Sequence, residues 1–403
     1  MKVIQINCVY GEGSTGKLVQ QLHHHLLMHG WESLVIYGRG RTSNEEGVIR
    51  LGSNLYGKLN KCISKLTGLM YGGCLLNTLK AIRIVQKEKP DVVHLHCLNG
   101  NFINIYKIVE WLKANHIKTV LTLHAEFMHT ANCSHAFECN KWQTGCGNCP
   151  RWKTETGSIF KDKTATSWKK MYAAFKDFHE LEVVSVSPWL MERAMQSPIL
   201  VKANHRVILN GIDTTVFKPC SAHPLISRLK SEGKKIILHV TPGFNLAPGH
   251  PKGGEYVVEL ARRLLKEKPD WCIVVAGTLM QDTPLPQNLI TLGSITNQRE
   301  LASLYSGASA TLLTSKKETF SMVTAESLCC GTPVVGFNSG APELIALPEY
   351  SHFSEQGDIK QLMEGLNVFT HSKEAQNISE AAKKKYSSEN MCKQYINLYH
   401  LRF

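Results

Sequence analysis

The chain has 403 residues, of which 43% are hydrophobic and 20% are charged, a composition that is typical of folded proteins and excludes disordered or low-complexity chains. The length predicts two or three domains of ordinary size. The 46 lysines and arginines outnumber the 33 acidic residues and give a formal charge of +13, which favours negatively charged partners such as nucleotide phosphates, anionic lipids or nucleic acid.

The amino-terminal residues read directly into a strand-like segment and lack the features of a secretory signal. No apolar run approaches the roughly 18 residues that a membrane-spanning helix needs. We therefore expect a cytoplasmic protein without a transmembrane helix. In a reducing compartment its 13 cysteines should be free thiols or metal ligands rather than disulfides.

Short β-branched runs alternate along the chain with longer amphipathic segments, which predicts parallel sheets built from βαβ units. In the first half the expected strands are residues 3–8, 33–37, 92–95, 118–123 and 182–186, with a helix at about 17–28. After a polar, proline-containing stretch at 210–233 the pattern restarts, with expected strands at 235–240, 272–276, 289–292, 310–314 and 333–336.

This organisation predicts an α/β protein with two doubly wound, Rossmann-like domains that face each other across a cleft. Residues 1–205 form the first domain, including a cysteine-rich loop at 126–153, and residues 206–380 form the second. Residues 381–403 are expected to form a helix that packs back toward the N-terminal domain. Ligands of open α/β sheets bind beyond the carboxyl ends of the strands, so residues that follow each strand are the first functional candidates.

A glycine-rich loop, Gly11-Glu12-Gly13-Ser14-Thr15-Gly16-Lys17-Leu18, follows the first expected strand. Leu18 occupies the position at which a P-loop needs Ser or Thr to bind Mg²⁺, so a P-loop NTPase is rejected. The backbone N–H groups of this turn, including that of Gly13, can bind an anion or approach a sugar closely. The alternative is a plain connection between strand and helix.

Two glutamates lie eight residues apart in the second half, at Glu318 and Glu326. With Ser321 as the N-cap, Glu318 falls in the loop after the strand at 310–314 and Glu326 in the early turns of the next helix. A loop carboxylate there can accept hydrogen bonds from sugar hydroxyls, and one on the helix can bind the two hydroxyls of a ribose. On spacing alone, solvated surface acids remain the alternative.

The glutamate pair belongs to a longer pattern, Glu318-x7-Glu326 followed by Leu328 and Gly331-Thr332-Pro333-Val334-Val335, that resembles the signature of the retaining GT-B glycosyltransferases of glycosyltransferase family 4. Two other segments resemble that family, Asp91-Val92-Val93-His94-Leu95-His96 and Asn210-Gly211-Ile212-Asp213 with Phe217 and Pro219. The resemblance runs from Val3 to about Glu343. It is strongest to the branch that builds colanic acid, capsule and O-antigen.

The resemblance implies a GT-B fold and a site for a nucleoside-diphosphate sugar, with no catalytic metal. It places Glu326 on the nucleotide ribose, Glu318 on the transferred sugar and Lys252 on the diphosphate, where a point charge stabilises the leaving group. It places His124 on the sugar from the opposite domain, the alternative being a hydrogen-bonded histidine at a strand end. Gly13 and Ser321 are the other donor-site candidates.

Two departures from the family pattern stand out. Relatives carry Asp after the histidine, whereas Ala125 and Glu126 follow His124 here. Glu126 is one candidate replacement; the alternative is that the shift by one residue turns its side chain elsewhere. Relatives also carry an Arg shortly before the lysine, and residues 241–249 contain none. A second cation for the diphosphate is therefore not identified by the sequence.

Four cysteines lie within seventeen residues in a C-x5-C-x6-C-x2-C pattern, at Cys133, Cys139, Cys146 and Cys149. Four soft ligands at this spacing suit a structural, tetrahedral Zn²⁺. The pattern also resembles a cysteine loop of the family branch named above. Free thiols or a disulfide are the alternatives.

The stretch from Arg50 to Lys89 contains eight cations and a single acid, Glu88, with apolar residues among them. A basic amphipathic surface of this kind can bind an anionic membrane, and a solvated helix face is the alternative. With the resemblance, the expected acceptor is a saccharide, such as a lipid-diphosphate-linked oligosaccharide, and the expected location is the inner face of the cytoplasmic membrane.

The function predicted from these observations is that of a retaining, hexosyltransferase-type glycosyltransferase in lipopolysaccharide, capsule or related surface-polysaccharide synthesis. A sugar-nucleotide epimerase could share the fold and the donor. A zinc-bearing nucleic-acid-binding protein would use the charge and the cysteines but leaves the pattern at 318–333 unexplained, so no nucleic-acid partner is expected. Donor sugar, base and linkage depend on contacts that no motif records.

Overall fold

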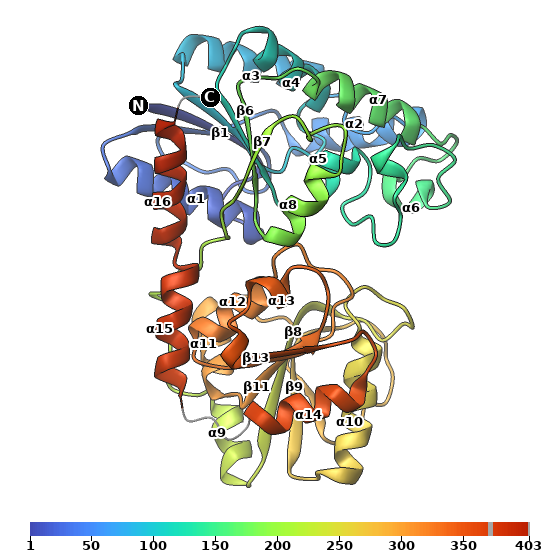
Figure 1. The fold of residues 1–403 in the computed structure, drawn as a ribbon, viewed down its shortest axis with the longest axis vertical. Coiled ribbons are helices and arrows are strands. Elements are labelled where there is room, and N and C mark those ends of the chain that lie inside the picture. Colours follow the sequence, from blue (N-terminus) through green and yellow to red (C-terminus); the bar gives the residue numbers. More distant parts are fainter. Residues whose placement is uncertain (370–373, 402–403) are drawn as a thin grey trace. The chain divides into compact units, whose positions relative to one another are not determined.

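The computed structural model of the protein describes residues 1–369 and 374–401. The chain forms two compact units, Met1–Leu209 together with the segment from Met391 onward, and Asn210–Asn390 (Figure 1). The sequence predicts these boundaries at 205 and 380, and residues 402–403 of the predicted C-terminal helix lie outside the described residues. In the described part of the chain, no helix is long and apolar enough to cross a membrane.

Unit 1 contains a seven-stranded parallel sheet in the order β3-β2-β1-β4-β5-β6-β7. Its strands are β1 (Lys2–Val9), β2 (Glu32–Arg39), β3 (Val48–Arg50), β4 (Val92–Leu95), β5 (Thr119–Leu123), β6 (Leu181–Ser185) and β7 (Asn204–Val207). The order reverses between β1 and β4, as in doubly wound nucleotide-binding domains, so residues that follow these two strands lie at the switch point.

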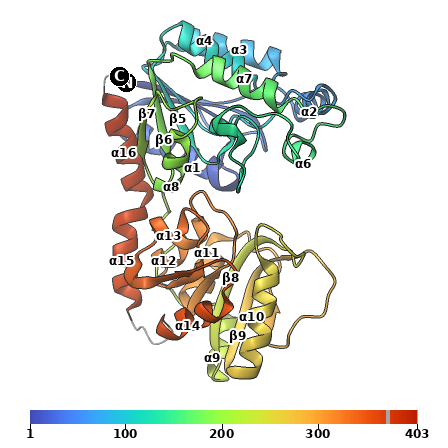
Figure 2. The same cartoon turned by 45° about the vertical axis from the view of Figure 1, so that its right-hand side comes forward.

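Helices cover both faces of this sheet (Figures 1 and 2). They are α1 (Gly13–Met28), α2 (Asn54–Thr67), α3 (Leu75–Glu88), α4 (Ile105–Ala114), α5 (Phe127–Thr130), α6 (Trp152–Thr156), α7 (Thr164–Phe175), α8 (Pro188–Met195) and α16 (Ser388–His400), with a 3-10 turn at Lys141–Gln143. Helices α1 and α16 pack on one face through a shared apolar core, and α3, α4 and α7 lie on the other.

The C-terminal helix α16 is part of the core of unit 1. Its buried side chains recur every three or four residues, which places them on one face of the helix: Met391, Cys392, Tyr395, Leu398 and Tyr399. They contact residues of α1 and of the central strands, including Leu22 and Val120. Full burial of a large apolar side chain stabilises the fold by about 1.5–3 kcal/mol, so this helix anchors the end of the chain to unit 1.

Unit 2 contains a six-stranded parallel sheet in the order β10-β9-β8-β11-β12-β13. Its strands are β8 (Lys235–Phe244), β9 (Trp271–Leu279), β10 (Leu289–Thr291), β11 (Ala310–Leu313), β12 (Val334–Phe337) and β13 (Ser351–Ser354). The switch point lies between β8 and β11. Together the two sheets confirm the predicted α/β class with two Rossmann-like domains.

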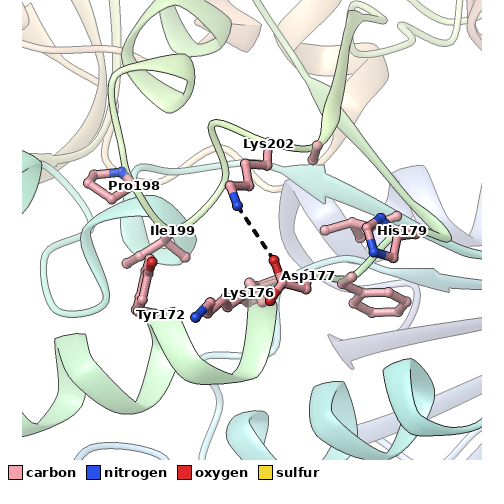
Figure 3. A pocket seen from close by; sticks show the side chains of 11 residues that line it. Tyr172, Lys176, Asp177, His179, Pro198, Ile199 and Lys202 are labelled. Atoms are coloured by element: carbon pink, nitrogen blue, oxygen red, sulfur yellow. Dashed lines mark ion pairs between the residues drawn. The ribbon is translucent and has the colours of Figure 1, made fainter.

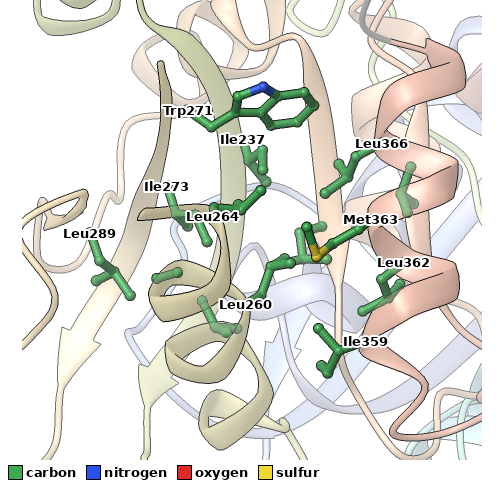
Figure 4. Packing of buried hydrophobic residues seen from close by; sticks show 14 of the residues in the cluster. Ile237, Leu260, Leu264, Trp271, Ile273, Leu289, Ile359, Leu362, Met363 and Leu366 are labelled. Atoms are coloured by element: carbon green, nitrogen blue, oxygen red, sulfur yellow. The ribbon is translucent and has the colours of Figure 1, made fainter. Parts of the chain in front are cut away.

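The helices of unit 2 are α9 (Pro224–Ser231), α10 (Gly254–Glu267), α11 (Gln298–Gly307), α12 (Met322–Cys329), α13 (Pro342–Ile345), α14 (Ile359–Phe369) and α15 (Ala375–Tyr386), with a 3-10 turn at Pro348–Tyr350. Figure 4 shows α10 and α14 packing over one face of the sheet through side chains such as Leu264, Met363 and Trp271. This dense core fixes α10, whose first turn carries part of the candidate site.

Three short strands, β3, β7 and β13, do not stand out in the sequence. Each is the outermost strand of its sheet, and most of its residues are only partly buried. A strand with one neighbour and a half-solvated surface lacks the continuous apolar run by which buried parallel strands are recognised. The central strands that carry the candidate site were predicted within a few residues.

Candidate functional site

Lys252 and Glu318 meet at the switch point of the unit 2 sheet. Lys252 lies in the loop that follows β8, and Glu318 lies in the loop that follows β11, the strand next to β8. The Lys252 Nζ atom donates to Glu318 Oε1 at 2.6 Å. The two side chains are 37% and 17% exposed, so the pair faces solvent and is open to competition from a ligand.

The backbone of the lysine loop is pinned against the end of β11. Gly253, the N-cap of α10, has a φ of +63°, and a Cβ atom there would lie 2.1 Å from the carbonyl oxygen of Thr314. The Thr314 hydroxyl donates to the carbonyl oxygen of Lys252 at 3.1 Å. Only glycine permits this conformation and this close approach, which together fix the position of Lys252 relative to the end of β11.

Glu318 is held by its own backbone. Its N–H donates to the Ser339 carbonyl at 2.9 Å, and its carbonyl accepts from the Ala341 N–H at 3.2 Å. The Glu343 carboxylate in turn accepts from the N–H groups of Ser339 and Gly340 at 3.0 and 2.8 Å. Sequence reasoning assigned no role to Glu343; its place in the first turn after Pro342, where an acid can cap exposed N–H groups, was the available signal.

Ser321 caps helix α12, as predicted. Its Oγ accepts from the Thr324 N–H at 3.2 Å and contacts the Thr324 hydroxyl at 2.9 Å, and the side chain is buried. Its φ of +77° is a strained conformation for a residue with a Cβ, at a cost of about 1–3 kcal/mol. The hydroxyl thus maintains the turn between the two glutamates.

Glu326 lies on α12 and accepts a hydrogen bond from the Tyr305 hydroxyl at 3.2 Å. Burial and the nearby carboxylate both raise the pKa of Tyr305 well above its usual value, so the phenol stays a neutral donor. The tyrosine therefore orients the Glu326 carboxylate by its hydrogen bond to Oε2. The sequence did not identify this partner because Tyr305 lies 21 residues earlier, on α11.

A second lysine, Lys316, lies at the same loop as Lys252. Its N–H donates to the Pro251 carbonyl at 2.8 Å, and its Nζ lies 3.8 Å from Glu255 Oε1 in the first turn of α10. A Cβ added to Gly249 would lie 3.7 Å from the same Nζ, which puts the ammonium beside the loop that precedes Lys252. The tertiary structure thus places a second lysine beside the loop that carries Lys252.

The histidines of unit 1 form a buried network at the ends of β4 and β5. His94 Nδ1 lies 2.6 Å from the Tyr399 hydroxyl on α16, and His94 Nε2 lies 2.7 Å from the hydroxyl of Thr122. Thr122 also contacts the Tyr395 hydroxyl at 2.8 Å. Two tyrosines of the C-terminal helix therefore fix the strand residues next to His124.

His124 lies directly after β5 and faces His96, which follows β4. His96 Nδ1 lies 3.2 Å from His124 Nε2, and the ring of His96 is tilted by 35° against that of His94 at a centroid distance of 3.8 Å. Burial lowers the pKa of His124 to about 4 and holds those of His94 and His96 well below the usual value. At neutral pH His124 is therefore an uncharged imidazole.

Gly13 opens helix α1 directly beyond β1, at the switch point of the unit 1 sheet. Its φ of +64° requires glycine, and a Cβ there would meet no atom within 4 Å. Gly13 and His124 belong to unit 1, whereas Lys252, Glu318 and Ser321 belong to unit 2. Within each unit the predicted residues gather at the carboxyl ends of the strands.

Glu126 does not take the place of the missing aspartate. Its side chain is fully buried and forms an ion pair with Arg193, a 3.5 Å contact with His129 Nε2 and a 2.8 Å hydrogen bond from the Ala136 N–H. Burial alone would raise the pKa of Glu126, but these partners keep it below its usual value. The carboxylate therefore holds the base of the cysteine loop and carries no sugar-binding role, which corrects the sequence-based interpretation.

The four loop cysteines are free thiols in this structure. Cys133 and Cys146 pack with Ala136 and Trp142 in a small apolar cluster. Burial raises the pKa of Cys146 to about 11, so its thiol is protonated in this arrangement. Among the residues that the structure describes, no group of three or more His, Cys, Asp or Glu side chains is arranged to hold a metal ion, and the zinc site stays a prediction from the ligand spacing alone.

A cavity of about 350 Å³ in unit 1 lies away from these residues (Figure 3). Its lining includes Leu181, the first residue of β6, and Ala203, which directly precedes β7. It is thus at the amino ends of the strands. Lys202 and Asp177 form a 3.5 Å ion pair at this cavity, and none of the predicted site residues lines it.

Comparison with protein families covers most of the chain. The model named glycosyl transferases group 1 matches residues 228–385, and the model named glycosyltransferase family 4 matches residues 15–216, about half of the chain. The chain belongs to glycosyltransferase family 4. It is thus an enzyme that transfers glycosyl groups, as the sequence predicted, and its two Rossmann-like units are those of the GT-B fold.

The glycosyltransferase is similar along its whole length to WcaC of Escherichia coli K12, which is named as a glycosyl transferase of colanic acid biosynthesis; the two are 21% identical, and the alignment covers 99% of each chain. Sucrose-phosphate synthase from Thermosynechococcus elongatus has a similar structure, with a TM-score of 0.67 at 17% identity over 99% and 98% of the chains. HepE from Anabaena, whose structure was solved with UDP, has a TM-score of 0.63 at 14% identity, and the alignment covers 99% of both chains.

The buried histidines predict how the stability of the glycosyltransferase depends on pH. Below about pH 6.5 the unfolded chain binds protons at its histidines, whereas folded His124 stays neutral until about pH 4. The free energy of unfolding should therefore fall as pH decreases through this window, by up to about 1.4 kcal/mol per pH unit for each such histidine. Urea unfolding at a series of pH values measures the slope. His124→Asn should reduce this slope, and a flat profile in the parent would exclude neutral buried histidines.

The ligand spacing of the cysteine loop predicts about one zinc per chain in protein produced with zinc available. Replacement of Cys146 and Cys149 together by Ser should remove it, while Cys62→Ser, at an exposed cysteine of α2, serves as the control. Elemental analysis of the purified protein gives the stoichiometry. Zinc-free protein would leave the four cysteines as the free thiols of the structure.

Proposed function

We propose that this enzyme transfers a sugar from a nucleoside-diphosphate sugar to a saccharide acceptor of a surface polysaccharide, with retention of anomeric configuration. The observation that carries the proposal is the contact of Lys252 with Glu318 at the switch point of unit 2. It joins a cation suited to the diphosphate and a carboxylate suited to sugar hydroxyls at the place where doubly wound sheets bind nucleotides.

The donor diphosphate is held by Lys252 and Lys316. Each ammonium is a compact point charge, and both belong to the loops that surround the start of α10. As the glycosidic bond breaks, negative charge develops on the departing diphosphate, and two fixed cations stabilise it more than they stabilise the ground state. The two lysines supply this charge from side chains of the protein.

Binding of the diphosphate breaks the Lys252–Glu318 pair. The pair is partly exposed, and such ion pairs contribute about 0–1 kcal/mol, so the phosphate oxygens replace Glu318 on the lysine at little cost. The released carboxylate is then available to accept hydrogen bonds from the transferred sugar. Glu326, oriented by Tyr305, accepts from the ribose hydroxyls.

His124 contacts the transferred sugar from unit 1 as a neutral imidazole. Its uncharged state matters because a neutral ring can accept or donate a hydrogen bond to a hydroxyl, whereas an imidazolium only donates. The Nδ1 atom of His96 lies 3.2 Å from Nε2 of His124, so this contact engages Nε2 within the protein. Gly13 allows the sugar or phosphate to approach the backbone at the start of α1.

The acceptor is a growing oligosaccharide, linked to a lipid diphosphate at the inner face of the cytoplasmic membrane. Similarity to WcaC over the whole chain and the formal charge of +13 support this assignment. A sugar-nucleotide epimerase would use the same donor but would convert it without an acceptor. Product formation that requires added saccharide therefore separates the two functions, and the anomeric configuration of the product tests retention.

Thermal unfolding with nucleotides tests donor binding. UDP is the first nucleotide to assay because HepE, which has a similar fold, was solved with UDP, and GDP and dTDP serve as comparisons. The matching nucleotide at about a hundred times its dissociation constant should stabilise the folded enzyme by about 2.7 kcal/mol and raise the midpoint. The same assay on Glu326→Ala, which lacks the ribose contact, should give a smaller shift. If none of the three nucleotides shifts the midpoint, the proposed donor class is wrong.

The two glutamates should respond differently to substitution. Glu326→Ala should weaken free nucleoside diphosphate binding by about 1.5–3 kcal/mol, the range for a hydrogen bond to a charged group. Glu318→Gln should lower turnover while the affinity for free diphosphate stays the same or rises a few-fold, because Lys252 loses its competing partner. Calorimetric titration and initial rates measure both. Equal losses of affinity and turnover in Glu318→Gln would exclude its assignment to the sugar.

A further inference from the structure

Helix α2 has its apolar side toward solvent. Its large apolar residues recur at i, i+4, i+8 and i+11 and lie on one face, where they are between 51% and 67% exposed: Leu55, Leu59, Ile63 and Leu66. The residues of α2 that are buried are Asn60 and Ser64. Helices of globular proteins normally turn the apolar stripe toward the core, so this orientation is the reverse of the expected one.

The reversed orientation is fixed by hydrogen bonds on the buried side of α2. Asn60 Oδ1 accepts from the Cys74 N–H at 2.7 Å, and Asn60 Nδ2 donates to the Tyr56 carbonyl at 2.8 Å. The start of the helix is capped by Ser53, whose hydroxyl accepts from the Tyr56 N–H. Rotation of the apolar face inward would break the Asn60–Cys74 hydrogen bond and leave the buried Cys74 N–H without this partner.

Two neighbouring segments extend the exposed apolar area. The start of α3 adds Leu75, Leu76 and Leu79, and the Leu76 N–H reaches the Tyr56 hydroxyl of α2 at 3.3 Å. The segment at 159–160 adds Ile159 and Phe160, and the Ile159 N–H donates to the Lys65 carbonyl at 3.0 Å. We call these nine apolar residues, with the lysines among them, the α2 surface. They are half of the 18 large apolar side chains that are exposed among the described residues, so the concentration is local.

The charge of the α2 surface is of one sign. Helix α2 carries Lys58, Lys61 and Lys65 and no acid, and Lys161 follows Phe160. Along α3 the first acid is Glu88, the last residue of the helix. Apolar side chains flanked by cations match a phospholipid layer, which offers anionic headgroups over an apolar interior. A second copy of the chain would bring equal charges together, which opposes self-association.

We propose that the α2 surface docks on an anionic phospholipid membrane, with the leucine and isoleucine side chains inserted among the acyl chains and the lysines at the headgroups. Such helices penetrate by about 5–10 Å, which is within reach of single side chains on an amphipathic helix. The inference is independent of the donor site in unit 2, because it rests on unit 1 alone. It predicts that membrane binding and glycosyl transfer can be separated by substitution.

Sedimentation of the full-length protein with vesicles tests the proposal. Vesicles rich in phosphatidylglycerol should bind the protein, and pure phosphatidylcholine vesicles should bind it at least tenfold more weakly. Binding should weaken as the salt concentration rises from about 0.1 M to 1 M, because the Debye length falls from about 10 Å to about 3 Å. Absence of binding to anionic vesicles at low salt would overturn the proposal.

Paired variants separate the apolar and the electrostatic contributions. Leu59→Ser with Ile63→Ser should weaken binding at least tenfold, and the matched control is Met28→Ser with Val201→Ser, which are also exposed. Lys58→Gln, Lys61→Gln and Lys65→Gln together should weaken it by up to about a hundredfold. Their control is the triple replacement of Lys169, Lys170 and Lys230 by Gln, at exposed positions elsewhere.

All variants change exposed or half-exposed side chains, so their thermal midpoints should equal that of the parent, and transfer to a soluble saccharide should be unchanged. Undiminished vesicle binding by Leu59→Ser/Ile63→Ser would overturn the assignment of the surface. Self-association that the same variant abolishes, without vesicle binding, would assign the surface to a second copy and also overturn it. Absence of glycosyl transfer to the soluble saccharide by the parent protein would instead count against the proposed function.

Discussion

The close approach of Gly253 to the end of β11 is the constraint on which the donor half of the molecule depends. A backbone with positive φ and no Cβ lets the lysine loop lie directly against the Thr314 carbonyl. Because β8 and β11 are adjacent at the reversal of strand order, this contact brings Lys252 to Glu318 and places Lys316 beside the same loop. Any larger residue at position 253 would separate the two loops and disperse the cations.

The candidate site residues of unit 1 are mainly buried and neutral, whereas those of unit 2 include charged side chains. His94 and His96 are buried, and His94 is bonded to Thr122 and Tyr399, while the half-buried His124 contacts His96, so the His124 ring is neutral and oriented. In unit 2 the two lysines stay partly exposed, and each forms an ion pair with a glutamate. The arrangement divides the proposed chemistry into recognition of hydroxyls by neutral groups and recognition of phosphate by cations.

The C-terminal helix α16 and helix α2 show two opposite uses of an amphipathic helix in one unit. Helix α16 buries its apolar face against the sheet and delivers two tyrosine hydroxyls to the histidine network. Helix α2 buries asparagine and serine and leaves its leucines outside. Part of the net positive charge of the chain lies on α2, where lysines lie beside the exposed apolar side chains.

The sequence by itself determined the α/β class, the two Rossmann-like domains and the central strands, because buried parallel strands leave continuous apolar runs. Its resemblance to glycosyltransferase family 4 also indicated Glu318, Glu326, Lys252 and His124 as candidate site residues. Only the tertiary structure decided which side chains meet. Lys316 and Tyr305 come from separate elements, Glu126 turns inward to Arg193, and the orientation of α2 depends on Asn60 bonding to Cys74. Periodicity records which face of a helix is apolar, but the contacts of its polar residues with distant segments decide which face is buried.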